Sequence, residues 1–419
     1  MAEKYTFPKR FLWGAATSSH QVEGGTHNQW SISELENAKS RAKQAQYKQT
    51  HLPDWAEIRP EATRPSNYVS GKATDHYHRY EEDFALLSSM NMNAFRFSIE
   101  WSRIEPEEGK WDEKAIEHYR TYIVALKKRG IEPVVTLFHW SMPVWFAEKG
   151  GFEHHGNIKY FERYAEKVLT EYEPLIRLIC TFNEPEVYVA QGWLHEGEWP
   201  PHKRGQYILG AWVYRNLAVA HNRVARRGQA MSRRFKFSVS KNCAHHYLGD
   251  TSYKSKFMIR MWQYISDYWF LNRIRRRMDW LGLNYYFSNR YIGGRVINEN
   301  IHMNDLGWEM RPDDIQFVLE RLYKKYRKPI IITENGVADR HDRYRRWWIA
   351  HTIDAIHKAM KNGVKVEGYL HWSLLDNFEW AYGKWPRFGL VEIDYKTLVR
   401  TIRPSAAWYG KVIKKLRAV

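Results

Sequence analysis

Short apolar runs that favour β-strands recur eight times along the chain, and each leads into a longer stretch with helical periodicity. The runs are apolar at nearly every position, as VVTLF and IIIT illustrate, which is typical of parallel strands covered on both faces. Eight such strand–helix units predict a single (β/α)8 TIM barrel. The predicted strands are residues 11–15, 94–99, 133–138, 178–182, 235–239, 280–283, 329–333 and 366–372.

The helical stretches end as helices usually do. Gly130 and Gly363 follow lysine-containing turns, a common helix stop. No linker rich in Pro, Gly or Ser separates the units, so we expect one domain over residues 1–419. The predicted helices are residues 75–90, 113–128, 158–175, 207–229, 256–277, 312–325, 344–361 and 404–416.

The charge of the chain is strongly basic. Lys and Arg number 65 against 47 Asp and Glu, a formal net charge of +18. These cations are spread in short clusters, such as Arg226 with Arg227, which favours solvated helix faces over a nucleic-acid or membrane surface. No apolar stretch approaches the roughly 18 residues of a membrane span. The two cysteines, Cys180 and Cys243, indicate no disulfide framework, so we expect a cytoplasmic protein.

Polar side chains gather where the predicted strands end. Barrel enzymes carry their catalytic groups at these carboxyl ends, and here Glu184 and Glu334 end the fourth and seventh strands. Two carboxylates that face each other across a barrel mouth suit glycoside hydrolysis. A single Glu at a strand end would more often be a helix cap or a surface charge. The same rim, however, also carries Gln21, Arg96, His139, Asn183, Asn284, Tyr286 and Trp372.

Seven ordered motifs cover almost the whole chain and resemble glycoside hydrolase family 1, the β-glucosidase and β-galactosidase family of retaining enzymes. They are FLWGAATSSHQVEG (11–24), FRFSIEWSRIEP (95–106), TLFHWSMPVW (136–145), TFNEP (181–185), LGLNYY (281–286), ITENG (332–336) and HWSLLDNFEW (371–380). TFNEP or ITENG alone would be a weaker sign than the ordered set.

The resemblance implies a role for individual residues. Glu184 corresponds to the general acid/base and Glu334 to the nucleophile, with carboxyls about 5 to 5.5 Å apart. Arg96, Tyr286 and Asn284 correspond to residues that position the nucleophile. We expect Arg96 to keep the pKa of Glu334 low, and the pKa of Glu184 to be raised. The implied sugar-binding residues are Gln21, His139, Asn183, Tyr286, Trp308, Trp372, Glu379 and Trp380.

Two departures from the family pattern concern the leaving-group side. Glu186 stands where an aromatic residue commonly follows TFNEP. Residues 34–74 replace a short entry loop with a longer insertion that is helix-prone over 38–46, so the preferred substrate length is expected to shift. Relatives that act on 6-phosphorylated sugars replace the pair Glu379 and Trp380. Both residues are present here, which favours unphosphorylated β-glucosides.

The sequence therefore predicts a retaining β-glycosidase that removes terminal β-D-glucosyl, and with it β-D-galactosyl or β-D-fucosyl, residues from small β-glycosides or short oligosaccharides. It predicts no metal, cofactor, nucleic-acid or membrane partner, since the histidines lack the spacing of a zinc site. A transglycosidase differs only in the acceptor, and a non-catalytic sugar-binding barrel would be expected to lose a carboxylate. These two alternatives, like the oligomeric state, stay open.

Overall fold

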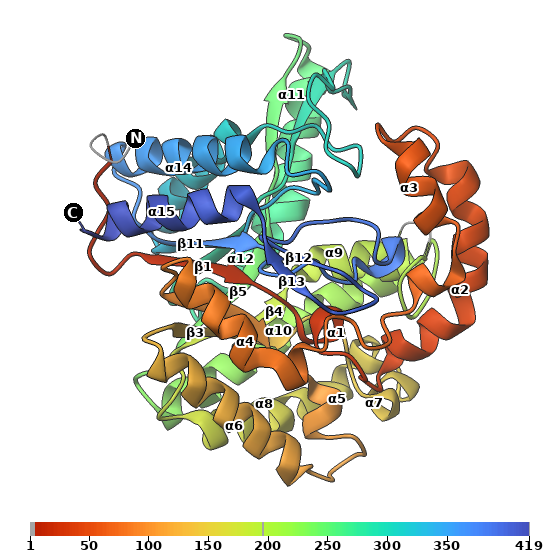
Figure 1. The fold of residues 1–419 in the computed structure, drawn as a ribbon, viewed down its shortest axis with the longest axis vertical. Coiled ribbons are helices and arrows are strands. Elements are labelled where there is room, and N and C mark those ends of the chain that lie inside the picture. Colours follow the sequence, from red (N-terminus) through yellow and green to blue (C-terminus); the bar gives the residue numbers. More distant parts are fainter. Residues whose placement is uncertain (1–4, 195–196, 419) are drawn as a thin grey trace.

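Eight parallel strands close into a barrel in the computed structural model, which describes residues 5–194 and 197–418 (Figure 1). Neighbours in the chain are neighbours in the barrel, and the last strand closes on the first, with Gly14 opposite Leu370. The predicted barrel is confirmed. Its strands are β1 (Leu12–Ala16), β2 (Ala94–Ser98), β3 (Glu132–Phe138), β4 (Leu178–Asn183), β5 (Lys236–Asn242), β7 (Leu281–Asn284), β10 (Ile330–Glu334) and β11 (Val366–Trp372).

Helices between the strands cover the outside of the barrel. α6 shows why they begin and end where they do: the side chain of Asp112 accepts hydrogen bonds from two backbone N–H groups of the first turn, and Gly130 follows the helix with a φ of 68°. The covering helices are α4 (His76–Ser89), α6 (Glu113–Lys128), α8 (Ile158–Tyr172), α10 (Tyr207–Met231), α11 (Tyr253–Trp262), α12 (Trp269–Ile274), α13 (Ile315–Tyr326), α14 (Arg345–Lys361) and α15 (Pro404–Ala418).

One predicted helix is divided. The stretch 256–277 forms α11, a π-helix η6 (Gln263–Tyr268) and α12. Within the π-helix the carboxylate of Asp267 is buried and pairs with Arg321 at 2.7 Å. The pattern of apolar residues did not reveal this widened turn, because a π turn displaces the helical periodicity by only one residue.

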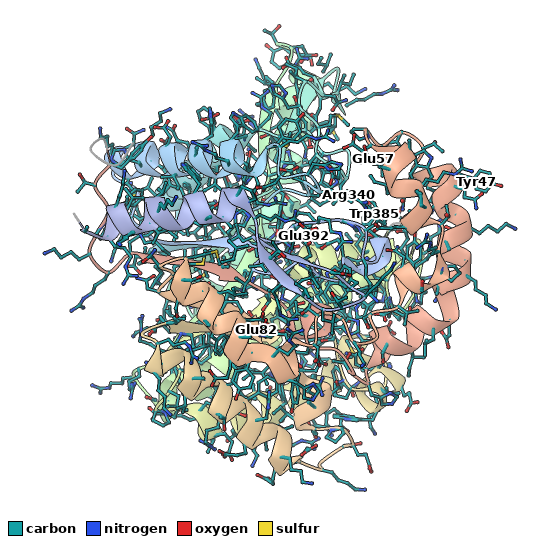
Figure 2. All side chains as sticks on the ribbon, viewed as in Figure 1. Tyr47, Glu57, Glu82, Arg340, Trp385 and Glu392 are labelled. Atoms are coloured by element: carbon teal, nitrogen blue, oxygen red, sulfur yellow. The ribbon has the colours of Figure 1, made fainter. Side chains whose placement is uncertain are left out.

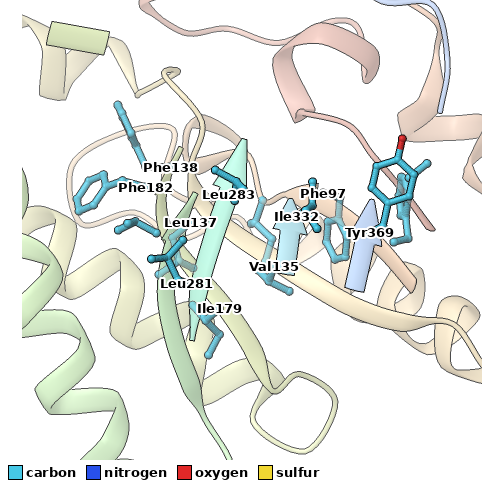
Figure 3. Close-up of a cluster of buried hydrophobic side chains, with 14 of the residues drawn as sticks. Phe97, Val135, Leu137, Phe138, Ile179, Phe182, Leu281, Leu283, Ile332 and Tyr369 are labelled. Carbon is cyan, nitrogen blue, oxygen red and sulfur yellow. The ribbon is translucent and has the colours of Figure 1, made fainter. Parts of the chain in front are cut away.

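The two faces of several strands pack into two different clusters. Ala94, Val134 and Leu370 belong to a small cluster of strand residues, whereas Phe95 and Val135 join the large core shared with the helices. Alternation along a strand explains this division, and it places Arg96 on the same face as Ala94. Figure 3 shows part of the large core, including Phe97, Val135, Leu137, Ile179, Leu283 and Ile332.

Additional elements lie in the connections between the barrel strands and helices. Two small sheets were not predicted: β6 (His245–Leu248), β8 (Ser288–Ile292) and β9 (Arg295–Val296) form one, and β12 (Val391–Ile393) with β13 (Arg400–Ile402) the other. The remaining helices are α1 (Ser19–Val22), α2 (Gln29–Lys48), α3 (Trp55–Ala62), η2 (Pro65–Tyr68), α5 (Trp101–Ile104), α7 (Val144–Glu148), η3 (Gly151–Glu153), η4 (His155–Asn157), α9 (Pro185–Val189), η5 (Ala190–Leu194), η7 (Pro312–Asp314) and η8 (Trp380–Tyr382).

The helix-prone insertion forms α2 and α3, which stand together on the right of Figure 1. Figure 2 shows Glu57 of α3 near the loop after β10 that carries Arg340. In that loop His341 contacts Glu57 at 2.6 Å and Arg340 pairs with Glu61 at 3.2 Å. The insertion is therefore fastened to the barrel rim.

The sequence analysis also predicted no disulfide framework and no membrane-spanning stretch. Cys180 and Cys243 are both free and buried. None of the helices among the described residues combines the length and the apolar character needed to cross a bilayer.

Candidate active site

The two predicted carboxylates lie on one cavity at the carboxyl ends of the barrel strands. Glu184 directly follows β4 and Glu334 ends β10, and the common direction of parallel strands brings both ends to the same rim. The cavity has a volume of about 330 Å³. Of the residues predicted for the site, those that line it are His139, Glu184, Tyr286, Trp308, Glu334, Trp372, Glu379 and Trp380.

Glu334 is held by a cation and a hydroxyl. Arg96 forms an ion pair with its Oε1 atom, and Tyr286 donates a hydrogen bond to Oε2 at 2.7 Å. The guanidinium is itself oriented by Thr136 and Asn183, whose side-chain oxygens accept from it at 3.0 and 2.8 Å. Arg96 and Tyr286 thus lie where the sequence placed them, beside one carboxylate.

Glu184 is held differently. Its backbone is left-handed, with φ 38° and ψ 64°, at the residue where β4 turns into α9. The amide of Asn284 donates to its Oε1 at 2.8 Å, and Thr333 fixes that amide by donating to Asn284 Oδ1 at 2.7 Å. Asn284 was predicted to position Glu334; its amide donates to Glu184 and to Asn183, and a side-chain interaction with Asn284 also lowers the pKa of Glu334. It therefore lies between the two carboxylates.

The two environments separate the pKa values of the carboxyl groups. Burial raises the pKa of Glu184 well above its usual range, and the negative charges of Glu334 and Glu186 raise it further. Burial also raises the pKa of Glu334, whereas Arg96 and Tyr286 lower it. The expectation that Arg96 keeps this pKa low is corrected here, because burial outweighs the cation. The order remains: Glu184 holds its proton more tightly than Glu334.

His139 and Asn183 form a neutral polar pair beside the cavity. Asn183 donates to His139 Nε2 at 3.0 Å, and burial lowers the pKa of His139 well below its usual value, so the imidazole is uncharged. Its ring lies nearly parallel to those of Trp372 and Trp380, with centroid distances of 5.9 and 6.2 Å. These rings provide flat apolar faces next to polar atoms, as sugar binding requires.

Glu379 lines another wall of the cavity, and the amide of the buried Gln21 donates to its Oε2 at 3.4 Å. The amide of Gln21 donates to the carbonyl of Phe378 at 2.8 Å, while Ser18 donates to Gln21 Oε1 at 2.7 Å. Burial and the charge of Glu334 raise the pKa of Glu379 to about 8. At neutral pH this carboxyl is therefore mostly protonated and can donate a hydrogen bond.

An ion pair beneath Glu184 was not predicted. Lys241, fully buried in β5, contacts Glu186 of α9 at 2.7 Å, and Glu186 Oε1 also accepts from the backbone N–H of Asn242 at 2.9 Å. The sequence analysis noted Glu186 as an unusual residue but did not connect it with Lys241. A lysine near the end of an otherwise buried strand was the available signal.

The sequence analysis predicted no metal site, and a metal site would require several ligating side chains close together. Among residues 5–194 and 197–418 the structure contains no group of three or more His, Cys, Asp or Glu side chains arranged to hold a metal ion.

Known proteins are similar to this chain in both sequence and fold. Beta-glucosidase A of Acetivibrio thermocellus is 28% identical over 98% of this chain and 99% of its own length. A beta-glycosidase from Pyrococcus horikoshii superposes with a TM-score of 0.85 at 34% identity, covering 98% of this chain and 96% of that one. A beta-glucosidase from Thermotoga maritima, solved in complex with glucoimidazole, superposes with a TM-score of 0.85 at 26% identity, covering 98% and 99%.

The family model for glycosyl hydrolase family 1 matches residues 3–274 and 271–417, which together span nearly the whole chain. The chain therefore belongs to glycosyl hydrolase family 1.

Proposed function

We propose that the chain is a retaining β-glycosidase that hydrolyses terminal non-reducing β-D-glucosyl residues, with β-D-galactosyl and β-D-fucosyl residues as further substrates. The observation that carries this proposal is the pair Glu184 and Glu334 on one cavity, the first held by an amide and the second by a cation and a hydroxyl. Such a pair can supply an acid and a nucleophile at the same pH. The β-glucosidase and β-glycosidase names of the relatives agree with it.

In the first step Glu184 gives its proton to the glycosidic oxygen while a carboxylate oxygen of Glu334 attacks the anomeric carbon. The bond from that carbon to the leaving oxygen breaks, and an ester between sugar and Glu334 forms. Arg96 opposes the effect of burial and stabilises the negative charge of the attacking carboxylate. Because the ester is neutral, the pKa of Glu184 falls, and Glu184 can take a proton from the water that hydrolyses the ester.

The sugar-binding residues support a single unphosphorylated hexose in this cavity. Its volume of about 330 Å³ is at the lower end of the roughly 300 to 1,000 Å³ of small-molecule sites. We assign the hydroxyl contacts to Gln21, His139, Asn183, Glu379 and Trp380, with Trp372 as the apolar floor, and Trp308 to the leaving-group side. A glucoimidazole complex of a relative supports a sugar-shaped ligand. The catalytic unit is proposed to be one domain over residues 1–419, and the two free buried thiols favour the cytoplasm.

Product stereochemistry tests this proposal directly. We expect proton NMR of a reaction with an aryl β-glucoside to show the β-anomer of glucose first, with the α-anomer arising later by mutarotation, because two displacements restore the original configuration. An α-glucoside should not react. If the α-anomer forms first, the reaction inverts, and Glu334 cannot be the nucleophile.

The pair Glu186 and Lys241 should tune the alkaline limb of the pH profile. Loss of activity at high pH reports deprotonation of Glu184, which must hold its proton to act as the acid. Glu186→Gln removes a negative charge that raises the pKa of Glu184, whereas Lys241 lowers that pKa. We therefore expect the alkaline limb of kcat/KM to move to lower pH in this variant.

Lys241→Met is the matched variant, and it removes the positive charge of the same ion pair. It leaves Glu186 without its cation, so the alkaline limb should move to higher pH or stay in place. The double variant, which removes both charges, should lie between the two single variants. A shift of both single variants in the same direction would contradict the electrostatic explanation and indicate a packing effect.

A further inference from the structure

Helix α11 exposes the apolar side chains that an ordinary surface helix buries. Ser255 is the one buried residue among its ten, whereas α13, of twelve residues, buries four apolar side chains. Tyr253 and Phe257 of α11 are 89% and 64% exposed. Exposed apolar side chains that lie together mark binding surfaces. We call those of α11 and the adjoining π-helix η6 the α11 ridge: Tyr253, Phe257, Trp262, Tyr264 and Ile265.

Polar contacts fasten the start of α11 to the small sheet formed by β6, β8 and β9. The hydroxyl of Ser252 caps the helix by accepting from the backbone N–H of Ser255 at 3.2 Å. The hydroxyl of Ser255 accepts from the backbone N–H of Gly294 at 3.0 Å, and the carboxylate of Asp250 accepts from that of Gly293 at 2.6 Å. The two glycines form the turn between β8 and β9. These contacts fix the helix without using the ridge side chains.

The ridge projects from one end of the molecule. In Figure 1 α11 stands at the upper end of the long axis, above α14. The sheet that holds it contains β6 and β8, which follow the carboxyl ends of β5 and β7. Phe287, which directly precedes β8, lines the catalytic cavity. The ridge is therefore connected to the catalytic rim through this sheet.

Exposed apolar side chains continue from the ridge onto the start of α10. Trp269, which follows η6, lines a surface hollow together with Ile208 and Trp212 of α10, and Ile208 is 90% exposed. The guanidinium of Arg273 lies 3.4 Å from the centroid of the Trp269 ring, and that of Arg215 lies 4.7 Å from the centroid of Trp212. This part of the surface is therefore both apolar and positively charged.

The exposed charge along the ridge has one sign. Asp267 is the one acidic residue within 253–277, and it is buried and paired with Arg321. Lys256 lies over the ring of Tyr253, 5.5 Å from its centroid. Exposed Trp, Tyr and Phe mixed with Lys and Arg are typical of helices that lie at the surface of an anionic bilayer. The seven cations of this segment are Lys254, Lys256, Arg260, Arg273, Arg275, Arg276 and Arg277.

The same charge argues against a second copy of the chain as the occupant. In a twofold dimer the ridge of one copy would face the ridge of the other. Lys254, Lys256 and Arg260 would then meet the same three cations of the other copy, and like charges that face each other in an interface are costly. A surface of lipid phosphates supplies the opposite charge.

We propose that the α11 ridge binds the surface of a lipid bilayer that contains anionic phospholipids, so that the protein associates with membranes without crossing them. Tyr253, Phe257 and Tyr264 enter the headgroup layer, and Lys256 and Arg260 contact the lipid phosphates. This differs from the expectation of no membrane partner. That expectation considered the basic clusters without the apolar side chains that are exposed beside them.

Sedimentation of the full chain with extruded vesicles tests the proposal. Vesicles of phosphatidylcholine and phosphatidylglycerol in a ratio of about 3:1 should bind the protein about tenfold more strongly than phosphatidylcholine alone, and added salt should weaken this binding. Phe257→Ser/Tyr264→Ser should lower the partition coefficient for the anionic vesicles about tenfold, because two aromatic side chains no longer enter the headgroup layer. Lys256→Gln/Arg260→Gln should lower it by about the same factor, and should leave binding to phosphatidylcholine alone unchanged.

Matched control variants lie on α2. Leu35→Ser/Tyr47→Ser removes two exposed apolar side chains, and Lys39→Gln/Lys43→Gln removes two exposed cations that are four residues apart, as Lys256 and Arg260 are. Both control variants should bind the anionic vesicles as the wild type does. Circular dichroism checks that each variant is folded, which we expect because none of the altered side chains is buried.

The proposal is overturned if the wild type binds neither kind of vesicle, if it binds both equally, or if the ridge and α2 variants lose binding alike. Light scattering examines the other occupant. A wild-type dimer that binds no vesicles and that Phe257→Ser/Tyr264→Ser converts into a monomer would assign the ridge to self-association, and would also overturn the proposal. Vesicle binding is measured without a glycoside, so its outcome is independent of the proposed glycosidase function.

Discussion

Glu334→Ala is expected to lower kcat/KM by about 10⁴-fold or more for every β-glycoside, whatever the quality of the leaving group. The reason is that removing the carboxylate that attacks the anomeric carbon abolishes the covalent route. In the catalytic cavity, Glu334 is the carboxylate that receives the ion pair from Arg96 and the hydroxyl contact from Tyr286. Steady-state rates on aryl β-glucosides of graded leaving-group pKa measure this loss.

A strand glutamate at the opposite end of the barrel provides the control. Glu132 begins β3 and pairs with Arg177 at 3.3 Å, far along the strand from the catalytic rim. Glu132→Ala should keep kcat/KM close to the wild-type value. In Glu334→Ala, added azide should enter from the vacated face and yield the α-glycosyl azide. A β-azide from this variant would assign the nucleophile to another residue.

Glu184→Ala should lose activity in a way that depends on the leaving group. A phenolate of low pKa can depart without a proton, so the glycosyl enzyme should still form in a burst. Poor leaving groups should react about 10²- to 10⁴-fold more slowly, the range typical of a lost general acid. Breakdown of the intermediate should be slow because no base activates water.

Added azide distinguishes the loss of the acid/base residue from a general loss of activity. It needs no deprotonation, so it should accelerate turnover of Glu184→Ala and give the β-glycosyl azide, identified by NMR. If azide instead leaves Glu184→Ala unchanged and the β-azide comes from Glu334→Ala, the two roles must be exchanged. Rates that fall equally for all leaving groups in Glu184→Ala would also argue against its role as the acid.

The positions of the two carboxylates were predictable because each depends on local information. Apolar runs of strand length mark β4 and β10, and parallel strands in a barrel place their carboxyl ends on one rim. Glu184 and Glu334 follow from their places at the ends of these runs. Arg96 followed in the same way, since alternation along β2 puts it on the inner face with Ala94. The catalytic roles of these residues stay predictions until the variants are measured.

The helix-prone insertion was only partly predictable. The sequence predicted helix over 38–46, and the structure extends α2 over Gln29–Lys48. The helix-prone composition predicted the helix, but composition does not indicate which side of the helix packs against the rest of the protein. The position of α2 depends on its contacts with Glu198 and His202, residues more than 150 positions away along the chain.

The sequence by itself determined the barrel, the rim and the identity of the side chains on it, because strand and helix periodicity and strand direction are local properties. The tertiary structure alone decided how those side chains are charged and joined: burial outweighs Arg96 at Glu334, Asn284 bonds to Glu184, and Glu186 meets Lys241. A pKa depends on solvent exclusion and on every charge nearby, whichever element carries it, so it is fixed only when β4, β5, β7 and β10 come together.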